Sequence, residues 1–463
     1  MKTIISTKYK LRKLISLAVL FSGCSNFTEV ELPSSQLTSA AVFENKTTAN
    51  AAMTDIYSKI RDKGLLTGNA TGLYRQLGLY TDELQYYGLE GTSQANFFNN
   101  SLLATGSEIT ELWNSSYNQI YAANAVIEGV KGSQALSDID KAQLTGEALF
   151  VRALIHFYLV NCFGPIPFIT ETDYRKNSAV SKIPEKTVYQ VVKKDLEQAV
   201  ELLPVNYVNT DRVRPNRAAA QALLARLCLY MELWEEASNN ASAVLNQTDL
   251  YVWPTVLDAI FLKESRSTIW QFSPSIAGRN TYEGANLIFA QGPPPSVAVT
   301  NDLLMAFSSN DLRKTQWIKT VTSGTSAWYH PYKYKRQTTT SSSVEYSIVF
   351  RIAEQYLIRA EARAHSGDLI GAKQDLNKTR NLAGLDNTAA VTASEIIDAV
   401  LIERRLEFFT ECGHRFFDLK RTNRLDAALL KVKPQWKNTN RLLPLPENEL
   451  LLNSNLKPQN EGY

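Results

Sequence analysis

The sequence predicts a mainly α-helical fold built from paired helices, and three observations carry this prediction. In residues 350–383, apolar side chains recur at helical spacing on both sides of a Ser-Gly-Asp turn. Residues 222–247 repeat this arrangement, and in both copies two alanines lie 12 positions apart, one in each helix. The chain also lacks the alternation of strands and helices that is typical of α/β enzymes.

The alanine spacing indicates a tetratricopeptide-like hairpin. Small side chains at facing positions let two helix backbones approach closely, so we expect Ala360 and Ala372 to be buried in one contact, and Ala225 and Ala237 in another. Two ordinary amphipathic helix pairs would show the same periodicity. At least three stacked units are expected for stability, so further, more degenerate units should accompany these two.

The other regular elements follow from apolar periodicity and from stop signals. Residues 267–272 predict a short strand, and helices are expected from 350 to about 430. Further helices are predicted over residues 40–61, 113–130, 138–163 and 184–203.

Two long stretches, 65–106 and 273–347, lack a helical period and are rich in aromatic side chains interleaved with Asn, Gln, Ser and Thr. Compact domains rarely keep irregular loops of this length without a use. We therefore expect the two stretches to meet on one face and to form a ligand site together.

The N-terminal residues 1–23 have the order of an export signal: a basic segment, eight mostly apolar residues, and then Phe21-Ser22-Gly23-Cys24. Small residues directly before a cysteine are similar to a bacterial lipobox, in which the cysteine is lipidated, so Cys24 is the predicted lipid anchor. A plain secretory signal with an incidental cysteine is the alternative.

The overall charge argues against a nucleic-acid ligand. Five basic residues precede position 24, and removing them turns a net charge of +3 into −2. The remaining cysteines lie in apolar, helix-like contexts without metal-ligand spacing, and we expect buried free thiols: Cys162, Cys228 and Cys412.

No motif of a known catalytic site occurs in the sequence. Its four histidines form no HExxH, and no P-loop, nucleophile elbow or dinucleotide fingerprint is found. We therefore predict no catalytic residue, no cofactor and no metal site. Glu403, Arg404, Arg405 and Glu407 cluster on one predicted helix, where an ion-pair network within that helix is the expected role.

Four blocks of the sequence resemble the SusD/RagB family of outer-membrane nutrient-binding lipoproteins. One begins GEALFVRALIHF and ends FGPIP, and a second reads RIAEQYLIRAEA. The third, ERRLEFFTECGHRFFDLKR, departs from the family pattern by Cys412, which intervenes between Glu411 and Gly413. The tail supplies LPLP and NLKPQNEGY. The blocks span residues 146–167, 351–362, 403–421 and 443–463.

The resemblance implies a mainly α SusD-like fold: four tetratricopeptide-like units, long irregular ligand-side loops and few short strands. It implies one SusD-like unit over 24–463, with an N-terminal part of about 24–215 and a C-terminal part of about 265–463. The charged residues of the second block should join helices: Arg351, Glu354, Arg359 and Glu361.

The same resemblance implies a lipid-anchored protein at the outer membrane, facing the cell surface, that is not an enzyme. It would capture oligosaccharides and deliver them to a SusC-type TonB-dependent transporter. A peptide-binding uptake lipoprotein is the alternative within the family. A surface glycosidase is the alternative outside the family, and it would need two carboxylates in a cleft.

Aromatic side chains in the two irregular stretches are the predicted ligand-binding residues. Sugar rings stack their C–H faces on aromatic rings, while their hydroxyls need polar partners. Packing, or contact with the transporter, is the alternative role for each ring. The predicted ligand-binding residues are Tyr86, Tyr87, Phe98, Asn99, Tyr282, Trp317, Trp328 and Tyr329.

Overall fold

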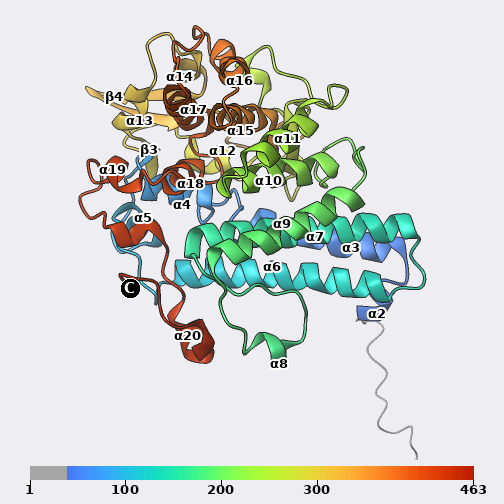
Figure 1. The fold of residues 1–463 in the computed structure, drawn as a ribbon. Coiled ribbons are helices and arrows are strands. Elements are labelled where there is room, and N and C mark those ends of the chain that lie inside the picture. The colour runs from blue at the N-terminus through green and yellow to red at the C-terminus, as the bar shows by residue number, and fades with distance from the viewer. Residues whose placement is uncertain (1–38) are drawn as a thin grey trace, which may run out of the picture.

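The computed structural model describes residues 39–463, so the predicted signal and Cys24 lie outside the described residues. Helices dominate, as predicted (Figure 1). The helices are α2 (Ser39–Val42), α3 (Lys46–Asp62), α4 (Leu73–Tyr80), α5 (Ser93–Phe98), α6 (Ser107–Gly132), α7 (Asp138–Phe163), α8 (Tyr174–Asn177), α9 (Glu185–Leu202), α10 (Arg217–Tyr230), α11 (Trp234–Leu245), α12 (Tyr282–Leu287), α13 (Asn301–Ala306), α14 (Leu312–Gln316), α15 (Ile352–His365), α16 (Leu369–Leu382), α17 (Ala393–Phe408), α18 (His414–Arg421), α19 (Leu425–Leu429) and α20 (Glu447–Leu452). Three 3-10 turns are Leu257–Ala259, Asn438–Arg441 and Ser454–Leu456.

The longer helices pack on one another in succession. Helix α3 contacts α6, and from there each helix packs on the next through α7, α9, α10, α11, α15 and α16, with α17 against the last two. This chain of helix pairs forms the frame of the molecule. Consecutive pairing of this kind is the architecture that the hairpin pattern predicts.

The two predicted hairpins are present, and their alanines are buried. Ala225, Ala237, Ala360 and Ala372 have no exposed surface. Between α15 and α16 the chain turns at Gly367, whose φ of +87° favours glycine. Asp368 then caps α16 by accepting the N–H of Gly371 at 2.9 Å.

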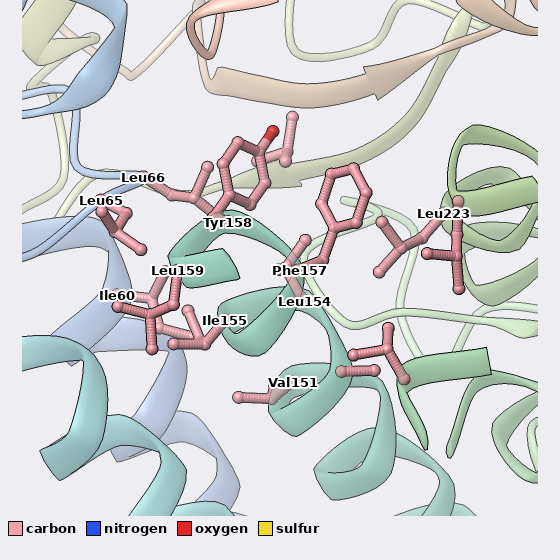
Figure 2. Packing of buried hydrophobic residues seen from close by; sticks show 14 of the residues in the cluster. Ile60, Leu65, Leu66, Val151, Leu154, Ile155, Phe157, Tyr158, Leu159 and Leu223 are labelled. Atoms are coloured by element: carbon pink, nitrogen blue, oxygen red, sulfur yellow. The ribbon is translucent and has the colours of Figure 1, made fainter. Parts of the chain in front are cut away.

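Helix α7 lies at the centre of the largest core. Every residue from 146 to 163 is buried, and Figure 2 shows its side chains meeting Ile60 of α3 and Leu223 of α10. By length and composition alone α7 could cross a membrane. Its apolar window is completely enclosed by the rest of the described chain, however, so α7 serves as a core helix.

In the described part of the chain, six short strands form three separate antiparallel pairs, β1–β3, β2–β6 and β4–β5. The strand expected at 267–272 is confirmed as β2. The helix expected from Phe350 begins only at Ile352, because Phe350 and Arg351 belong to β6, which pairs with β2. The strands are β1 (Leu84–Tyr86), β2 (Thr268–Phe272), β3 (Val297–Val299), β4 (Ile318–Ser323), β5 (Ser326–Pro331) and β6 (Ser347–Arg351).

The charged cluster on α17 does not form a network within that helix, so this prediction is wrong. Each side chain pairs with a residue from another part of the chain: α14, α18, the segment between α4 and β1, or the segment before α15. The pairs are Glu403–Arg313 (2.6 Å), Arg404–Asp418 (2.7 Å), Arg405–Asp82 (2.9 Å) and Glu407–Arg351 (2.5 Å).

The charged residues of the second resemblance block join elements, as expected. Arg351 also binds Glu411, and the other three pair across helices. These pairs are Glu354–Arg226 (2.6 Å), Arg359–Asp375 (2.7 Å) and Glu361–Arg421 (2.5 Å). The block is therefore framework in this structure.

Candidate ligand-binding face

The two irregular stretches meet, as the sequence predicts, through strands β1 and β3. Leu84 lies opposite Val299 and Tyr86 opposite Val297 in an antiparallel ladder. The ladder extends on one side, where the N–H of Tyr87 donates to the carbonyl of Ser296 at 2.7 Å. Segments more than 200 positions apart in the sequence thus form one surface, which we call the loop face.

The β4–β5 hairpin is the second part of the loop face and packs on β3. Trp328, on β5 of this hairpin, packs against a small cluster of Phe289, Ala298 and Val321. Gly292 makes this possible, because a Cβ at that position would come within 2.1 Å of the Trp328 ring. Trp328 remains half-buried, so part of its ring is open to solvent.

The predicted residues of the first stretch differ in how open they are. Tyr87 is 42% exposed. Tyr86 is half-buried, and its hydroxyl lies 2.6 Å from Thr92 Oγ1. Phe98 packs on Tyr86, and the Lys433 ammonium lies 3.9 Å from the Phe98 ring centroid, so Phe98 already has partners. Asn99 ends α5.

Trp317 belongs to the core, which makes its prediction as a ligand-stacking residue wrong. Its side chain has no exposed surface and packs edge-on against Phe261 at 5.5 Å. The Lys333 ammonium lies 5.1 Å from the Trp317 ring centroid. Tyr329 is half-buried against the same core cluster. Because side chains alternate along β5, Tyr329 and Trp328 point to opposite faces.

Tyr282 lines a hollow of about 220 Å³, which we call the Tyr282 hollow. Its hydroxyl donates to Asp62 Oδ1 at 3.3 Å. Asn280, Gln337 and Thr338 also line it and contribute two amides and a hydroxyl. The mixture of two aromatic rings, Phe272 and Tyr282, with several hydrogen-bonding groups is the composition expected of a small-molecule site.

A second hollow, the Tyr332 hollow, has a volume of about 570 Å³ and shares Gln337 and Thr338 with the first. Lys319 and Lys335 flank the Tyr332 ring, with their ammonium nitrogens 5.0 and 4.7 Å from its centroid. His330 also lines this hollow, and burial lowers the pKa of its imidazole. This hollow was not among the predicted sites, although the run YHPYKYKR at 329–336 interleaves aromatic and basic residues.

A third hollow, of about 700 Å³, lies between α6, the segment around α8, and α20. Tyr117, Tyr121 and Tyr174 line it together with asparagine side chains. Neither irregular stretch contributes to it, and Figure 1 shows α8 and α20 at the bottom of the view and β3 and β4 at the upper left. We call it the α6 groove.

The described residues offer little reactive chemistry. Among residues 39–463, no three His, Cys, Asp or Glu side chains cluster as a metal site would require. Cys162, Cys228 and Cys412 are free, the first two buried and the third half-buried, and burial raises each thiol pKa to about 12. Thiols with such a pKa are poor nucleophiles at neutral pH.

One pair of carboxylates shares a cavity, but the cavity is too small for a sugar. Glu283 and Glu411 both line two small voids of about 20 and 10 Å³, the size of a single water molecule. Glu411 is held by Arg351 and Lys333. The Tyr282 and Tyr332 hollows have no carboxylate in their linings, and the α6 groove has one, Glu449.

Two family models match the chain. Residues 33–229 match a SusD-like family described as starch-binding and associating with the outer membrane, and residues 305–463 match the SusD family. The chain is 27% identical to SusD-like protein P2 of Formosa agariphila, over 98% of this chain and all of that protein. It is 24% identical to SusD-like protein P25 of the same organism, over 97% of this chain and 99% of that protein.

Solved structures share the fold. A SusD superfamily protein from Bacteroides vulgatus matches with a TM-score of 0.77 at 20% identity, over 90% of this chain and 99% of that one. A laminarin-binding SusD-like protein matches with a TM-score of 0.75 at 23% identity, over 90% and 100%. A surface glycan-binding protein A from Bacteroides fluxus matches with a TM-score of 0.74 at 22% identity, over 90% of this chain and 100% of that one. With both family models and the full-length relatives in agreement, the chain belongs to the SusD/RagB family.

Proposed function

We propose that this protein captures glycans on its loop face at the cell surface and delivers them to a SusC-type TonB-dependent transporter. The observation that carries the proposal is the meeting of the two aromatic stretches at the β1–β3 ladder, beside two connected hollows. Relatives named for laminarin binding and for surface glycan binding support a carbohydrate ligand.

The chemistry of the loop face suits a sugar. Tyr87 and Trp328 offer partly exposed rings for the C–H faces of sugars, and Tyr282 and Tyr332 offer rings inside the hollows. The Gln337 side-chain oxygen and the Thr338 hydroxyl are offered to sugar hydroxyls, whereas the Asn280 amide is already bonded to Thr340 and Val344. Binding without reaction is the proposed role, because a glycosidase would need two carboxylates about 5–9.5 Å apart in a space that admits a sugar ring.

Anchoring and delivery complete the proposal. A lipid on Cys24 would hold the protein at the outer membrane, 15 residues before the first described residue, where the transporter is embedded. A lipid-anchored capture protein raises the local concentration of ligand at the transporter. The transporter remains the proposed partner, and we propose no cofactor.

Calorimetry against a panel of oligosaccharides and peptides, with chromatography of the products, tests this function. We expect binding of a glycan without cleavage. Trp328→Ala and Tyr282→Ala should each weaken it about tenfold or more, equivalent to ~1–2 kcal/mol. Tyr174→Ala in the α6 groove is the matched control, since Tyr174 is an exposed aromatic residue outside the loop face.

Three outcomes would contradict the proposal in different ways. Binding lost only in Tyr174→Ala would move the site to the α6 groove. Binding of peptides but not of glycans would favour the peptide-uptake alternative. Shortened products after incubation with the wild-type protein would show that it is an enzyme.

A further inference from the structure

The linings of the Tyr282 and Tyr332 hollows carry charge of one sign. The Tyr332 hollow contains Lys319, Lys335 and Arg336, and the Tyr282 hollow contains Arg61 and Arg279. No aspartate or glutamate from residues 39–463 lines either hollow. The whole chain has 49 basic and 46 acidic residues, so a lining with five basic residues and no acidic one departs sharply from its average composition.

Two of the five cations are already paired. Arg61 binds Asp62 at 2.6 Å, and Lys335 binds Asp258 at 2.9 Å. Within residues 39–463, no carboxylate lies within 4 Å of the side-chain nitrogens of Lys319, Arg336 or Arg279, all of which are exposed. These three side chains therefore form no ion pair with a carboxylate of the described chain.

Glu345 interacts electrostatically with Arg336 but does not line either hollow. Glu345 accepts the backbone N–H groups of Lys335 at 2.7 Å and of Arg336 at 3.0 Å. Its carboxylate is thus bound beneath this segment of backbone and does not line the hollow. Burial is the main cause that raises its pKa, opposed by these two hydrogen bonds.

We propose that the loop face selects acidic glycans, whose carboxylate or sulfate groups bind Lys319 and Arg336 while a sugar ring packs on Tyr332. This inference rests on the proposed glycan-binding function and specifies its ligand class. The Tyr332 ring and the Lys319 ammonium, 5.0 Å from its centroid, offer both contacts within one hollow. Arginine and lysine are the usual partners of such anionic groups, through charge-assisted hydrogen bonds.

Native affinity electrophoresis of the full mature chain tests the inference. The gels contain neutral polysaccharides (laminarin, dextran, xylan), carboxylated ones (polygalacturonate, alginate) or sulfated ones (carrageenan, chondroitin sulfate). We expect retardation by at least one acidic polysaccharide, and weaker retardation at high salt. The carboxylated and sulfated arms identify which anion is recognised.

The double variant Lys319→Glu/Arg336→Glu should lose at least tenfold in apparent affinity for the acidic polysaccharide. The matched control is Lys186→Glu, which reverses one exposed charge on α9, away from both hollows. A thermal melt of each variant verifies the fold; both target side chains are exposed.

Each of the following results supports or overturns the proposed selectivity for acidic glycans. Loss in the double variant with retention in the control supports the inference. Retardation by neutral polysaccharides alone would overturn it and leave the proposed function intact. Equal loss in the control and the double variant would show non-specific charge attraction and also overturn it. No retardation in any gel would contradict the proposed function itself.

Discussion

The buried ion pair between Arg226 of α10 and Glu354 of α15 should be among the most sensitive contacts in the frame. Both oxygens of Glu354 accept hydrogen bonds of 2.6 Å from the guanidinium. The Arg226 and Glu354 side chains are 2% and 1% exposed. Arg226 also donates to the Tyr158 hydroxyl at 2.7 Å and lies 4.6 Å from the Phe350 ring centroid.

Replacing Glu354 with alanine would leave the guanidinium buried with its charge uncompensated. Breaking such a pair from one side costs about 3–5 kcal/mol. The Arg226 guanidinium would lose its two hydrogen bonds to the carboxylate. Its bond to the Tyr158 hydroxyl, a neutral acceptor, cannot replace them. We therefore expect Glu354→Ala to lower the free energy of unfolding by about 3–5 kcal/mol, measured by urea denaturation.

A matched control separates burial from charge. Asp398 pairs with Arg424 at 2.5 Å, but their side chains are 49% and 46% exposed. Asp398→Ala should cost at most about 1 kcal/mol, because water screens an exposed pair. Replacing both Arg226 and Glu354 with leucine should be less harmful than Glu354→Ala alone, since no buried charge remains. If Glu354→Ala costs no more than Asp398→Ala, the argument from burial is wrong.

Four further predictions concern the core, acid stability and the anchor. Ala360→Leu should overpack the contact with α16 and cost about 1–3 kcal/mol, and an unchanged melting temperature would contradict the hairpin contact. Trp317→Ala should cost about 3–5 kcal/mol in urea denaturation, whereas a stable variant with lost glycan affinity would restore it as a surface residue. Burial lowers the pKa of His156 to about 3, and its ring accepts the N–H of Ile169 at 3.3 Å. Protonation therefore favours the unfolded chain, so stability should fall as the pH drops from about 6.5 towards 3, and His156→Gln should flatten that part of the curve of unfolding free energy against pH; an unchanged slope would refute this assignment. Cys24→Ala should release the protein from membranes into soluble fractions, and unchanged membrane partitioning would rule out the lipid anchor.

The frame could be predicted from the sequence because its signals are local. Helix α7 runs over the predicted residues, 138–163, since Ser137 caps one end and Gly164, with a φ of +74°, ends the other. Helix α9 differs from its prediction by one residue at each end. Continuous apolar periodicity and capping residues are properties of neighbouring positions, and they need no knowledge of the partner element.

The errors arose where the partner is distant in the sequence. Residues 350 and 351 continue the helical pattern of α15, yet β2 draws them into a strand. The acidic and basic residues of α17 have spacings that suit pairs within a helix, but buried partners from other elements outcompete them. Nothing in a local pattern reveals such a partner.

The candidate site was predicted at the level of stretches, while its individual rings were not. Composition identified 65–106 and 273–347, and the β1–β3 ladder joins them. Trp317 and Trp328 have similar neighbours in the sequence, yet one is fully buried and the other half-buried. Strand alternation at 326–331 could have separated Trp328 from Tyr329, had that segment been identified as a strand.

The β1–β3 ladder also has a consequence for how the protein reaches its native state. Val299 must find Leu84 across 215 intervening peptide bonds, whereas each helical hairpin closes over a few residues. Contacts of long separation form slowly, because the chain loses much entropy before they are made. The individual helical hairpins should therefore form before the loop face. A chain trapped halfway would have helical circular dichroism and no capacity to bind ligand, so far-ultraviolet spectra alone are a poor measure of whether a preparation is functional.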